Sequence, residues 1–363
     1  MQNTAQMRFL IIQQKMVGDV LASTILCEHL KIHFPDCEVH YVINESTLAV
    51  VEENPFVDKI ILFKNEYRES KLAFFKFLKS LKREKYDATI DVYCKLESNL
   101  ISYYSNADIK ISYKKWYSKF IYTHLFSYTN NPNTTLGHAI ENRLILLAPL
   151  IPELNQPNLA PKIYLSTPEK EKAKELLANH QIDTSKPLIM VGLLGSQPSK
   201  TYPLAYLAKT LDFISERYRV TFLVNYMPHQ SASLSEFLDH CSSKTRNNIK
   251  EEVFCPSLRS FIALLDQCDA YIGNEGGSTN MAKAIGIPNF SIFSPWISKT
   301  AWLTFNQNQK NQAVHLADFA PEILEMPKKE RKANAEALYQ QFKPELFLEQ
   351  LDSFIRSEVV SDQ

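Results

Sequence analysis

Three loops of the sequence carry side chains whose types and spacing suit group-transfer chemistry. The first, residues 13–20, follows the apolar run from Arg8 to Gln13, which predicts a buried strand. Gly18 permits a tight turn there, and Asp19 stands where a helix is expected to begin. Two interpretations of Asp19 stay open: a carboxylate that caps the helix, or a carboxylate placed to accept a proton from a substrate.

The second loop, residues 192–203, combines two glycines with hydroxyl groups and one lysine, ahead of a helix expected from Pro203. Backbone N–H groups at a helix start, together with an ammonium group, form a site for an anion. Ser196, Lys200 and Thr201 are therefore candidates for binding phosphate. The spacing differs from the phosphate loop G-x-x-x-x-G-K-[ST], and a solvated loop with an incidental lysine is the alternative.

The third loop, residues 273–280, holds three of the eight glycines of the chain within five residues. Small residues at a turn between a strand and a helix let a phosphate approach exposed N–H groups. The phosphate candidates in this loop are Gly276, Gly277, Ser278 and Thr279. Glu275 suits hydrogen bonding to hydroxyl groups, as a sugar offers. A tight turn without a ligand is the alternative.

A fourth region, residues 103–128, interleaves nine aromatic residues with lysines in an otherwise neutral protein. Such a mixture suits the interface of an anionic membrane, but it also suits a core helix with a solvated face or a surface on which a carbohydrate stacks. The candidates for contact with an acceptor or a membrane are Lys114, Lys115, Trp116 and Lys119.

The elements that position these loops alternate between strands and helices. Strands are predicted at 8–13, 39–43, 59–63, 86–92, 188–193, 220–225, 270–273 and 289–293. Helices are predicted at 19–34, 71–85, 136–148, 203–217, 257–267 and 279–285, with a helical tail at 333–355. This alternation is typical of α/β folds with parallel sheets, and in such sheets ligands bind beyond the carboxyl ends of the strands.

Length and composition limit the remaining possibilities. A chain of 363 residues suggests two domains, and Pro149, Pro152, Pro157 and Pro161 mark a linker between them. Lys+Arg and Asp+Glu both number 40, which disfavours binding of nucleic acid through global charge. No apolar stretch reaches the roughly 20 residues of a membrane span. The six cysteines show no zinc spacing and are expected to be reduced thiols.

The motifs of these loops resemble those of glycosyltransferase family 9, which contains the lipopolysaccharide heptosyltransferases. The resemblance covers both halves of the chain in order and rests on K-M-V-G-D-V, G-S-Q-P-S-K-T-Y-P and N-E-G-G-S-T-N-M-A-K-A-I-G-I-P. It implies that Asp19 is the catalytic base and that Lys200 contacts the phosphates of the donor. Glu275 and Asn280 stand where the family has Asp and His at the donor site, so both are candidates for contact with the donor sugar.

The resemblance also implies a GT-B fold, with two Rossmann-like, doubly wound α/β domains facing a central cleft. We expect an acceptor-binding domain at 1–160, a nucleotide-sugar-binding domain at 161–330, and a C-terminal helix within 331–363 that returns to the first domain. Gly18 joins the candidates for binding the donor phosphates. No metal is expected, in agreement with the lack of a D-x-D motif in the sequence.

The activity implied is that of an inverting glycosyltransferase without a resident cofactor. It would move a sugar from a nucleotide-diphosphate donor, with ADP-heptose as the first candidate, to a lipopolysaccharide-core or related glycolipid acceptor. The expected location is cytoplasmic, peripheral at the inner leaflet of the cytoplasmic membrane, with no nucleic-acid partner. The alternatives are a nucleotide-sugar epimerase of the same architecture and a catalytically inactive nucleotide-sugar-binding protein.

Overall fold

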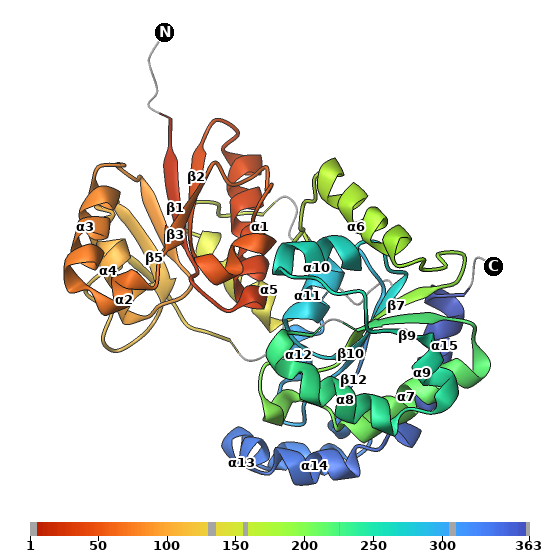
Figure 1. Cartoon of the computed structure of the whole chain (residues 1–363). Helices are drawn as coiled ribbons and strands as arrows, with labels where there is room; N and C mark the ends of the chain where they lie inside the picture. Colours follow the sequence, from red (N-terminus) through yellow and green to blue (C-terminus); the bar gives the residue numbers. More distant parts are fainter. Residues whose placement is uncertain (1–5, 130–135, 155–158, 225, 305–309, 361–363) are drawn as a thin grey trace. The chain divides into compact units, whose positions relative to one another are not determined.

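The structure, a computed structural model, describes residues 6–129, 136–154, 159–224, 226–304 and 310–360. It divides into two compact units, residues 1–164 and 165–363 (Figure 1). The division falls between Tyr164 and Leu165, four residues after the domain boundary that the sequence predicts at residue 160. Of the linker prolines, Pro157 lies outside the described residues.

The first unit is built on a six-stranded sheet in which every pairing is parallel. Its strands are β1 (Arg8–Ile12), β2 (Glu38–Asn44), β3 (Lys59–Phe63), β4 (Ala88–Asp91), β5 (Ile109–Tyr113) and β6 (His124–Phe126). Its helices are α1 (Val17–His33), α2 (Glu66–Glu69), α3 (Lys71–Lys82), α4 (Leu96–Tyr104) and α5 (His138–Leu144). Helices α1 and α5 pack together, as do α3 and α4.

The second unit repeats this plan with another six-stranded parallel sheet. Its strands are β7 (Leu188–Gly192), β8 (Thr221–Val224), β9 (Ile249–Lys250), β10 (Ala270–Asn274), β11 (Asn289–Ile292) and β12 (Asn311–Val314). Its helices are α6 (Thr167–Asn179), α7 (Leu204–Arg217), α8 (Ser231–His240), α9 (Ser243–Asn248), α10 (Leu258–Leu265), α11 (Gly277–Ala284), α12 (Lys299–Trp302), α13 (Lys328–Ala333), α14 (Ala335–Gln341) and α15 (Leu348–Glu358).

The order of the strands is the same in both sheets. The first runs β3-β2-β1-β4-β5-β6, and the second runs β12-β11-β10-β7-β8-β9, which is the same order seen from the other edge. This is the doubly wound Rossmann order, in which the strand order reverses between the neighbouring first and fourth strands of each unit. The predicted α/β class with two Rossmann-like domains is therefore confirmed, and the reversal points are where ligand sites are expected.

The C-terminal helix corrects one expectation. Leu351, Phe354 and Ile355 of α15 are fully buried in the apolar core of the second unit, in the same cluster as Leu207 and Leu211 of α7. The helix is amphipathic, and the periodicity of its apolar residues does not say which core it will join. It is therefore part of the second unit and not an element that returns to the first.

Region 103–128 contains two strands, so the interpretation of this stretch as a core helix is wrong. Helix α4 ends at Tyr104, and β5 and β6 then extend the first sheet. Ile111 and Tyr113 of β5 are buried on the sheet, whereas the loop from Lys114 to Phe120 is mainly exposed. Among the described residues no helix has the length and apolar character needed to cross a membrane.

Candidate functional site

A cavity of about 210 Å³ opens where the strand order reverses, between β1 and β4 of the first unit. The loops that follow these two strands diverge here, which leaves a space at the carboxyl edge of the sheet. The cavity is lined by Gln13, Lys15, Asp19, Val92, Tyr93, Tyr113, Tyr128 and Arg143. The structure therefore places Asp19 at the ligand-binding position of its sheet.

The Asp19 carboxylate is held by an arginine that the sequence analysis did not identify. Helix α1 begins at Val17 with Met16 as its N-cap residue, so Asp19 lies within the first turn and is not the cap. Arg143 Nη2 lies 2.8 Å from Asp19 Oδ1 and 3.2 Å from the Asp19 carbonyl oxygen. The Arg143 side chain is only 5% exposed, whereas that of Asp19 is 35% exposed. One face of the carboxylate is thus fixed and the other remains accessible.

The remaining donors of Arg143 hold the guanidinium rigidly. Its Nε donates to Ser23 Oγ at 2.8 Å, and its Nη1 donates to the Ala139 carbonyl oxygen. Burial alone would lower the pKa of Arg143, but the charge of Asp19 raises it, and the net pKa lies above its usual value. The arginine therefore stays protonated and orients Asp19 permanently.

Tyrosine rings and a second carboxylate complete this edge of the sheet. The rings of Tyr113 and Tyr128 pack edge to face beside the cavity, with their centroids 5.6 Å apart. At the end of β4, the Asp91 carboxylate is fully buried and accepts hydrogen bonds from the Tyr122 hydroxyl at 2.5 Å and from the Cys94 N–H at 2.8 Å. Burial raises the pKa of Asp91 to about 6. Asp91 thus anchors the loop that forms one wall of the cavity.

The exposed loop between β5 and β6 carries the four predicted acceptor or membrane residues. Lys114, Lys115 and Lys119 are exposed, and Trp116 is 86% exposed. Beside them the Phe120 side chain is 90% exposed. The Tyr117 hydroxyl donates to the Cys94 carbonyl oxygen at 3.3 Å, which ties this loop to the loop after β4. A fixed backbone therefore presents basic and aromatic side chains together.

In the second unit, the loops after β7 and β10 meet at the corresponding reversal point. Asn274 joins them, because its Nδ2 donates to the carbonyl oxygens of Gly192 and Leu193, both at 2.9 Å, and its Oδ1 accepts from the Tyr202 N–H at 2.6 Å. Gly273 has a φ of 146°, and a Cβ atom there would collide with the backbone of Gly192. Asn274 stands at the start of the motif N-E-G-G-S-T-N, but nothing in the motif predicts that its side chain joins the two loops.

Helix α11 begins at Gly277, with Gly276 as the N-cap residue. No hydrogen bond within the described residues uses the N–H groups of Gly277, Ser278 or Thr279, as is usual for the first turn of a helix. A Cβ atom added to Gly276 would meet nothing within 4 Å, so the space beside the turn is open. The helix start therefore presents free donors to an open approach, as an anion requires.

The other candidates of this turn face different surroundings. The buried hydroxyl of Thr279 donates to the Asn274 carbonyl oxygen at 3.1 Å and so stabilises the turn. Glu275 is only 7% exposed. Burial lowers the pKa of Lys283 to about 8, while the charge of Glu275 raises it. The charge of Glu275 thus stabilises the ammonium group of the half-buried Lys283. Asn280 is partly exposed on the first turn of α11.

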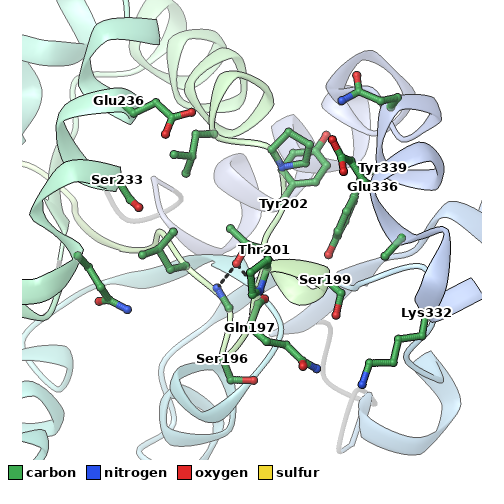
Figure 2. A pocket seen from close by; sticks show the side chains of 18 of the residues that line it. Ser196, Gln197, Ser199, Thr201, Tyr202, Ser233, Glu236, Lys332, Glu336 and Tyr339 are labelled. Atoms are coloured by element: carbon green, nitrogen blue, oxygen red, sulfur yellow. Dashed lines mark hydrogen bonds between the residues drawn. The ribbon is translucent and has the colours of Figure 1, made fainter.

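Two neighbouring cavities of the second unit contain most of the other candidates. A cavity of about 150 Å³ includes Ser278, with Tyr226 and Phe261 among its walls. A larger pocket of about 780 Å³ includes Ser196 and Thr201 (Figure 2). The Thr201 hydroxyl accepts from the Gly195 N–H at 3.1 Å and donates to the Gln197 carbonyl oxygen, so it shapes the loop.

Lys200 and Gly18 are not among the residues that line these two cavities. The Lys200 ammonium lies 5.4 Å from the centre of the Trp296 ring, and Trp296 Nε1 donates to the Ser199 carbonyl oxygen at 2.9 Å. Gly18 is buried in α1 of the first unit. Nowhere in the described ranges do three or more His, Cys, Asp or Glu side chains gather as ligands for a metal.

Comparison with known proteins identifies the family. The sequence model of glycosyltransferase family 9 (heptosyltransferase) matches residues 74–329, more than half of the chain. Lipopolysaccharide heptosyltransferase 3 of Escherichia coli is 23% identical over 285 residues, 76% of this chain and 80% of that protein. Lipopolysaccharide heptosyltransferase 1 of Campylobacter coli is 22% identical over 296 residues, 79% of this chain and 84% of that protein.

Solved structures agree on the fold. The glycosyl transferase family 9 protein from Veillonella parvula superposes with a TM-score of 0.73 at 17% identity, over 95% of this chain and 98% of that one. The E. coli heptosyltransferase WaaC with ADP superposes with a TM-score of 0.68 at 14% identity, over 96% of this chain and 100% of that one. With the GT-B fold and the sequence match together, the chain belongs to glycosyltransferase family 9.

Proposed function

We propose that this protein is an inverting glycosyltransferase that uses a nucleotide-diphosphate sugar and acts on a hydroxyl group of a lipopolysaccharide-core or related glycolipid. The family supports sugar transfer, and the relatives named as lipopolysaccharide heptosyltransferases make ADP-heptose the first donor to test. In the proposed reaction the acceptor oxygen forms a bond to the anomeric carbon, the bond to the diphosphate breaks, and the acceptor proton passes to the protein.

The observation that carries the proposal is the position of Asp19. Its carboxylate lies in a cavity at the reversal point of the first sheet, is partly exposed, and is oriented by the buried guanidinium of Arg143. A carboxylate with one oxygen fixed and one face accessible suits a general base for a hydroxyl group. Asp19 would take the proton as the acceptor oxygen attacks.

The second unit supports a donor site. The free N–H groups at the start of α11 and the open space beside Gly276 suit the negative charge of a departing diphosphate. Ser278 connects this turn to the small cavity, where Tyr226 and Phe261 provide apolar walls of a kind that a nucleobase can contact. Lys200 would add its positive charge, and no resident metal or cofactor is part of the proposal.

The exposed loop of the first unit supports a peripheral location at the inner face of the cytoplasmic membrane. Lys114, Lys115 and Lys119 would meet anionic head groups, while Trp116 and Phe120 would enter the interface. An acceptor with a lipid anchor would be presented at that surface.

The experiment that tests the donor site is thermal unfolding with ADP, GDP, UDP and CDP, using Lys200→Ala as the comparison variant. A nucleotide present at 100 times its dissociation constant adds about 2.7 kcal/mol to the free energy of unfolding. We expect stabilisation by one nucleotide and a smaller shift in the variant. Stabilisation by none of the four would contradict a preformed nucleotide site.

Incubation with a nucleotide sugar, with and without a glycolipid acceptor, then tests transfer. The proposal predicts a glycosylated lipid and release of the nucleoside diphosphate only when the acceptor is present. Conversion of the donor without an acceptor would indicate an epimerase. Binding of the donor without any product, across acceptors of the lipopolysaccharide-core class, would indicate an inactive binding protein.

A further inference from the structure

Tyr128 presents an aromatic face to the cavity that holds Asp19. Its side chain lines that cavity and is 54% exposed. Its ring packs edge to face on Tyr113, with the ring centroids 5.6 Å apart. An edge-to-face contact covers at most one face of either ring. Because Tyr113 is only 8% exposed, the aromatic surface open to a ligand belongs to Tyr128.

The position of the Tyr128 ring is fixed from α5. The Asn142 side chain accepts from the Thr129 N–H and donates to the Thr129 carbonyl oxygen, both at 2.9 Å, so it holds the backbone directly after Tyr128. It also donates to the His138 carbonyl oxygen at 2.8 Å, within α5. The Asn142 carbonyl oxygen accepts from the Tyr113 hydroxyl at 2.8 Å. Both rings are therefore tied to one residue of α5.

The next residue of α5 orients the base. Arg143 follows Asn142 in the chain, and its Nη2 lies 2.8 Å from the Asp19 carboxylate. Partial burial raises the pKa of the Tyr128 hydroxyl, the charge of Arg143 lowers it, and that of Asp19 raises it. The hydroxyl end of the ring is therefore near the base. One turn of helix thus sets both the aromatic face and the carboxylate.

The chemistry of the cavity suits one sugar ring. Its volume of about 210 Å³ is below the roughly 300 Å³ at which sites for drug-sized ligands begin. The side chains of Lys15, Tyr93 and Tyr128 line it, and their polar groups form no hydrogen bond or ion pair within the described part of the chain. A sugar has an apolar face of C–H groups and a rim of hydroxyl groups, so the aromatic face and these polar groups match its two kinds of surface.

We propose that Tyr128 is the platform on which the terminal sugar of the acceptor stacks, and that Asn142 is the positioning residue that holds this platform in register with Asp19. The inference rests on the proposed transfer reaction and adds to it the residue that selects the acceptor. The platform requires a sugar with C–H groups exposed together on one face. Stacking of that face leaves the hydroxyl groups at the rim of the ring, where one of them can reach the carboxylate.

Saturation-transfer NMR tests stacking without requiring turnover. The probe is a deacylated lipopolysaccharide-core oligosaccharide, added to the full chain while the aromatic protons of the protein are saturated. We expect the saturation to pass most strongly to C–H protons on one face of the terminal sugar. Tyr128→Phe keeps the ring and should keep this pattern. Tyr128→Leu keeps an apolar side chain without a ring and should weaken the signal at least threefold.

Steady-state transfer separates stacking from a structural role. Tyr128→Leu and Asn142→Ala should each raise KM for the acceptor at least fivefold and leave KM for the nucleotide sugar within twofold. Tyr128→Phe should restore the acceptor KM. Asn142→Ala keeps the backbone carbonyl that holds Tyr113, so it tests the side-chain bonds to Thr129. Tyr103→Leu removes a tyrosine of similar exposure, 61%, from α4 and is the matched control. Unfolding temperatures confirm that each variant is folded.

Three results would overturn the proposal. They are an NMR signal in Tyr128→Leu equal to that of the wild type, the same rise in acceptor KM in Tyr103→Leu, or a fall in vesicle binding of Tyr128→Leu that matches its fall in transfer. The last would assign the ring to the membrane.

Failure of the platform is distinguishable from failure of the proposed function. If the oligosaccharide gives no signal while a nucleotide still stabilises the protein, the platform fails and the donor site stands. A signal that depends on Tyr128 without any transfer would retain the sugar platform and remove the transferase.

Discussion

The accessible carboxylate of Asp19 depends on a residue 124 positions further along the chain. Arg143 reaches it because α5 packs against α1, which brings a buried guanidinium next to the first turn of α1. A buried arginine is stable only with its donors satisfied, and Asp19, Ser23 and Ala139 satisfy them. The base and its orienting group are therefore one structural unit.

Asp19→Asn should lower the turnover number by about 10²–10⁴-fold, because the amide cannot accept the acceptor proton. Affinity for the nucleotide should stay within about twofold, and the amide oxygen can still accept from Arg143. Initial rates of transfer and nucleotide titrations measure the two effects. Asp36→Asn, at an exposed carboxylate of the same unit, is the control. Turnover equal to that of the wild type would exclude Asp19 as the base.

The buried carboxyl of Asp91 predicts a pH dependence of stability. Its pKa of about 6 in the folded protein exceeds the value of about 3.9 expected when unfolded. The folded state then binds more protons, so the free energy of unfolding falls as pH rises from about 4 to 6 and is level above that. The group's contribution to this fall is on the order of 3 kcal/mol.

The test is urea unfolding of the wild type and Asp91→Asn across this pH range. Asparagine does not titrate and can still accept from Tyr122, so the variant should gain stability relative to the wild type as pH rises. Parallel stability curves for the two proteins between pH 4 and 6 would show that Asp91 is ionised at a normal pKa.

Asp19 could be predicted from its place after a strand, whereas Arg143 could not be paired with it, because their contact depends on tertiary packing. The sequence nevertheless contains a signal that Arg143 is buried and needs a partner. Arg143 lies on the same helical stripe as the buried Ile140, Leu144 and Leu147. A charge in an apolar stripe requires a partner, so it marks a residue to examine even when the partner is unknown.

At the scale of elements, the sequence predicts most strands that carry long apolar runs. The range predicted for β3 agrees with the structure at both ends, and the ranges predicted for β7 and β11 extend one residue too far. β5 was missed, although Ile109 and Ile111 alternate with polar residues, because aromatic residues around it suggested a helix. β9 has two residues, too few to show a period.

The loop from Lys114 to Phe120 should bind anionic membranes. Lys114→Glu with Lys115→Glu removes two charges that contribute about 1 kcal/mol each near such a surface, so partition into anionic vesicles should fall at least tenfold. Sedimentation with vesicles that contain phosphatidylserine, an anionic lipid of the cytoplasmic leaflet, measures it. Lys172→Glu with Lys329→Glu makes the same change in net charge at exposed lysines of the second unit and is the control. Equal loss in both double variants would indicate a nonspecific effect of net charge.

At the scale of the whole molecule, each unit has its own parallel sheet and apolar core. The two-domain arrangement followed from the repeated alternation of strands and helices. The assignment of α15 did not, because its apolar residues would suit either core, and the structure places them with Leu207 and Leu211. Local pattern thus predicts an element but not the sheet that it covers.

The division into two units predicts which segments a bound nucleotide protects from amide exchange. A nucleoside diphosphate should slow amide hydrogen exchange in residues 192–203 and 273–284 of the second unit, and leave residues 13–20 of the first unit unchanged. Exchange followed by mass spectrometry resolves these segments. Protection confined to residues 13–20 would place the nucleotide in the other unit and contradict the proposed roles of both.

The three hydrogen bonds of the Asn274 side chain have a consequence for how the protein can change. Two are donated to carbonyl oxygens and one is accepted from an N–H, so only a primary amide fits. A carboxylate at this position, as in Asn274→Asp, would oppose two carbonyl oxygens and release both loops together. The loops after β7 and β10 are therefore one cooperative unit, which the change of a single side chain should disable as a whole.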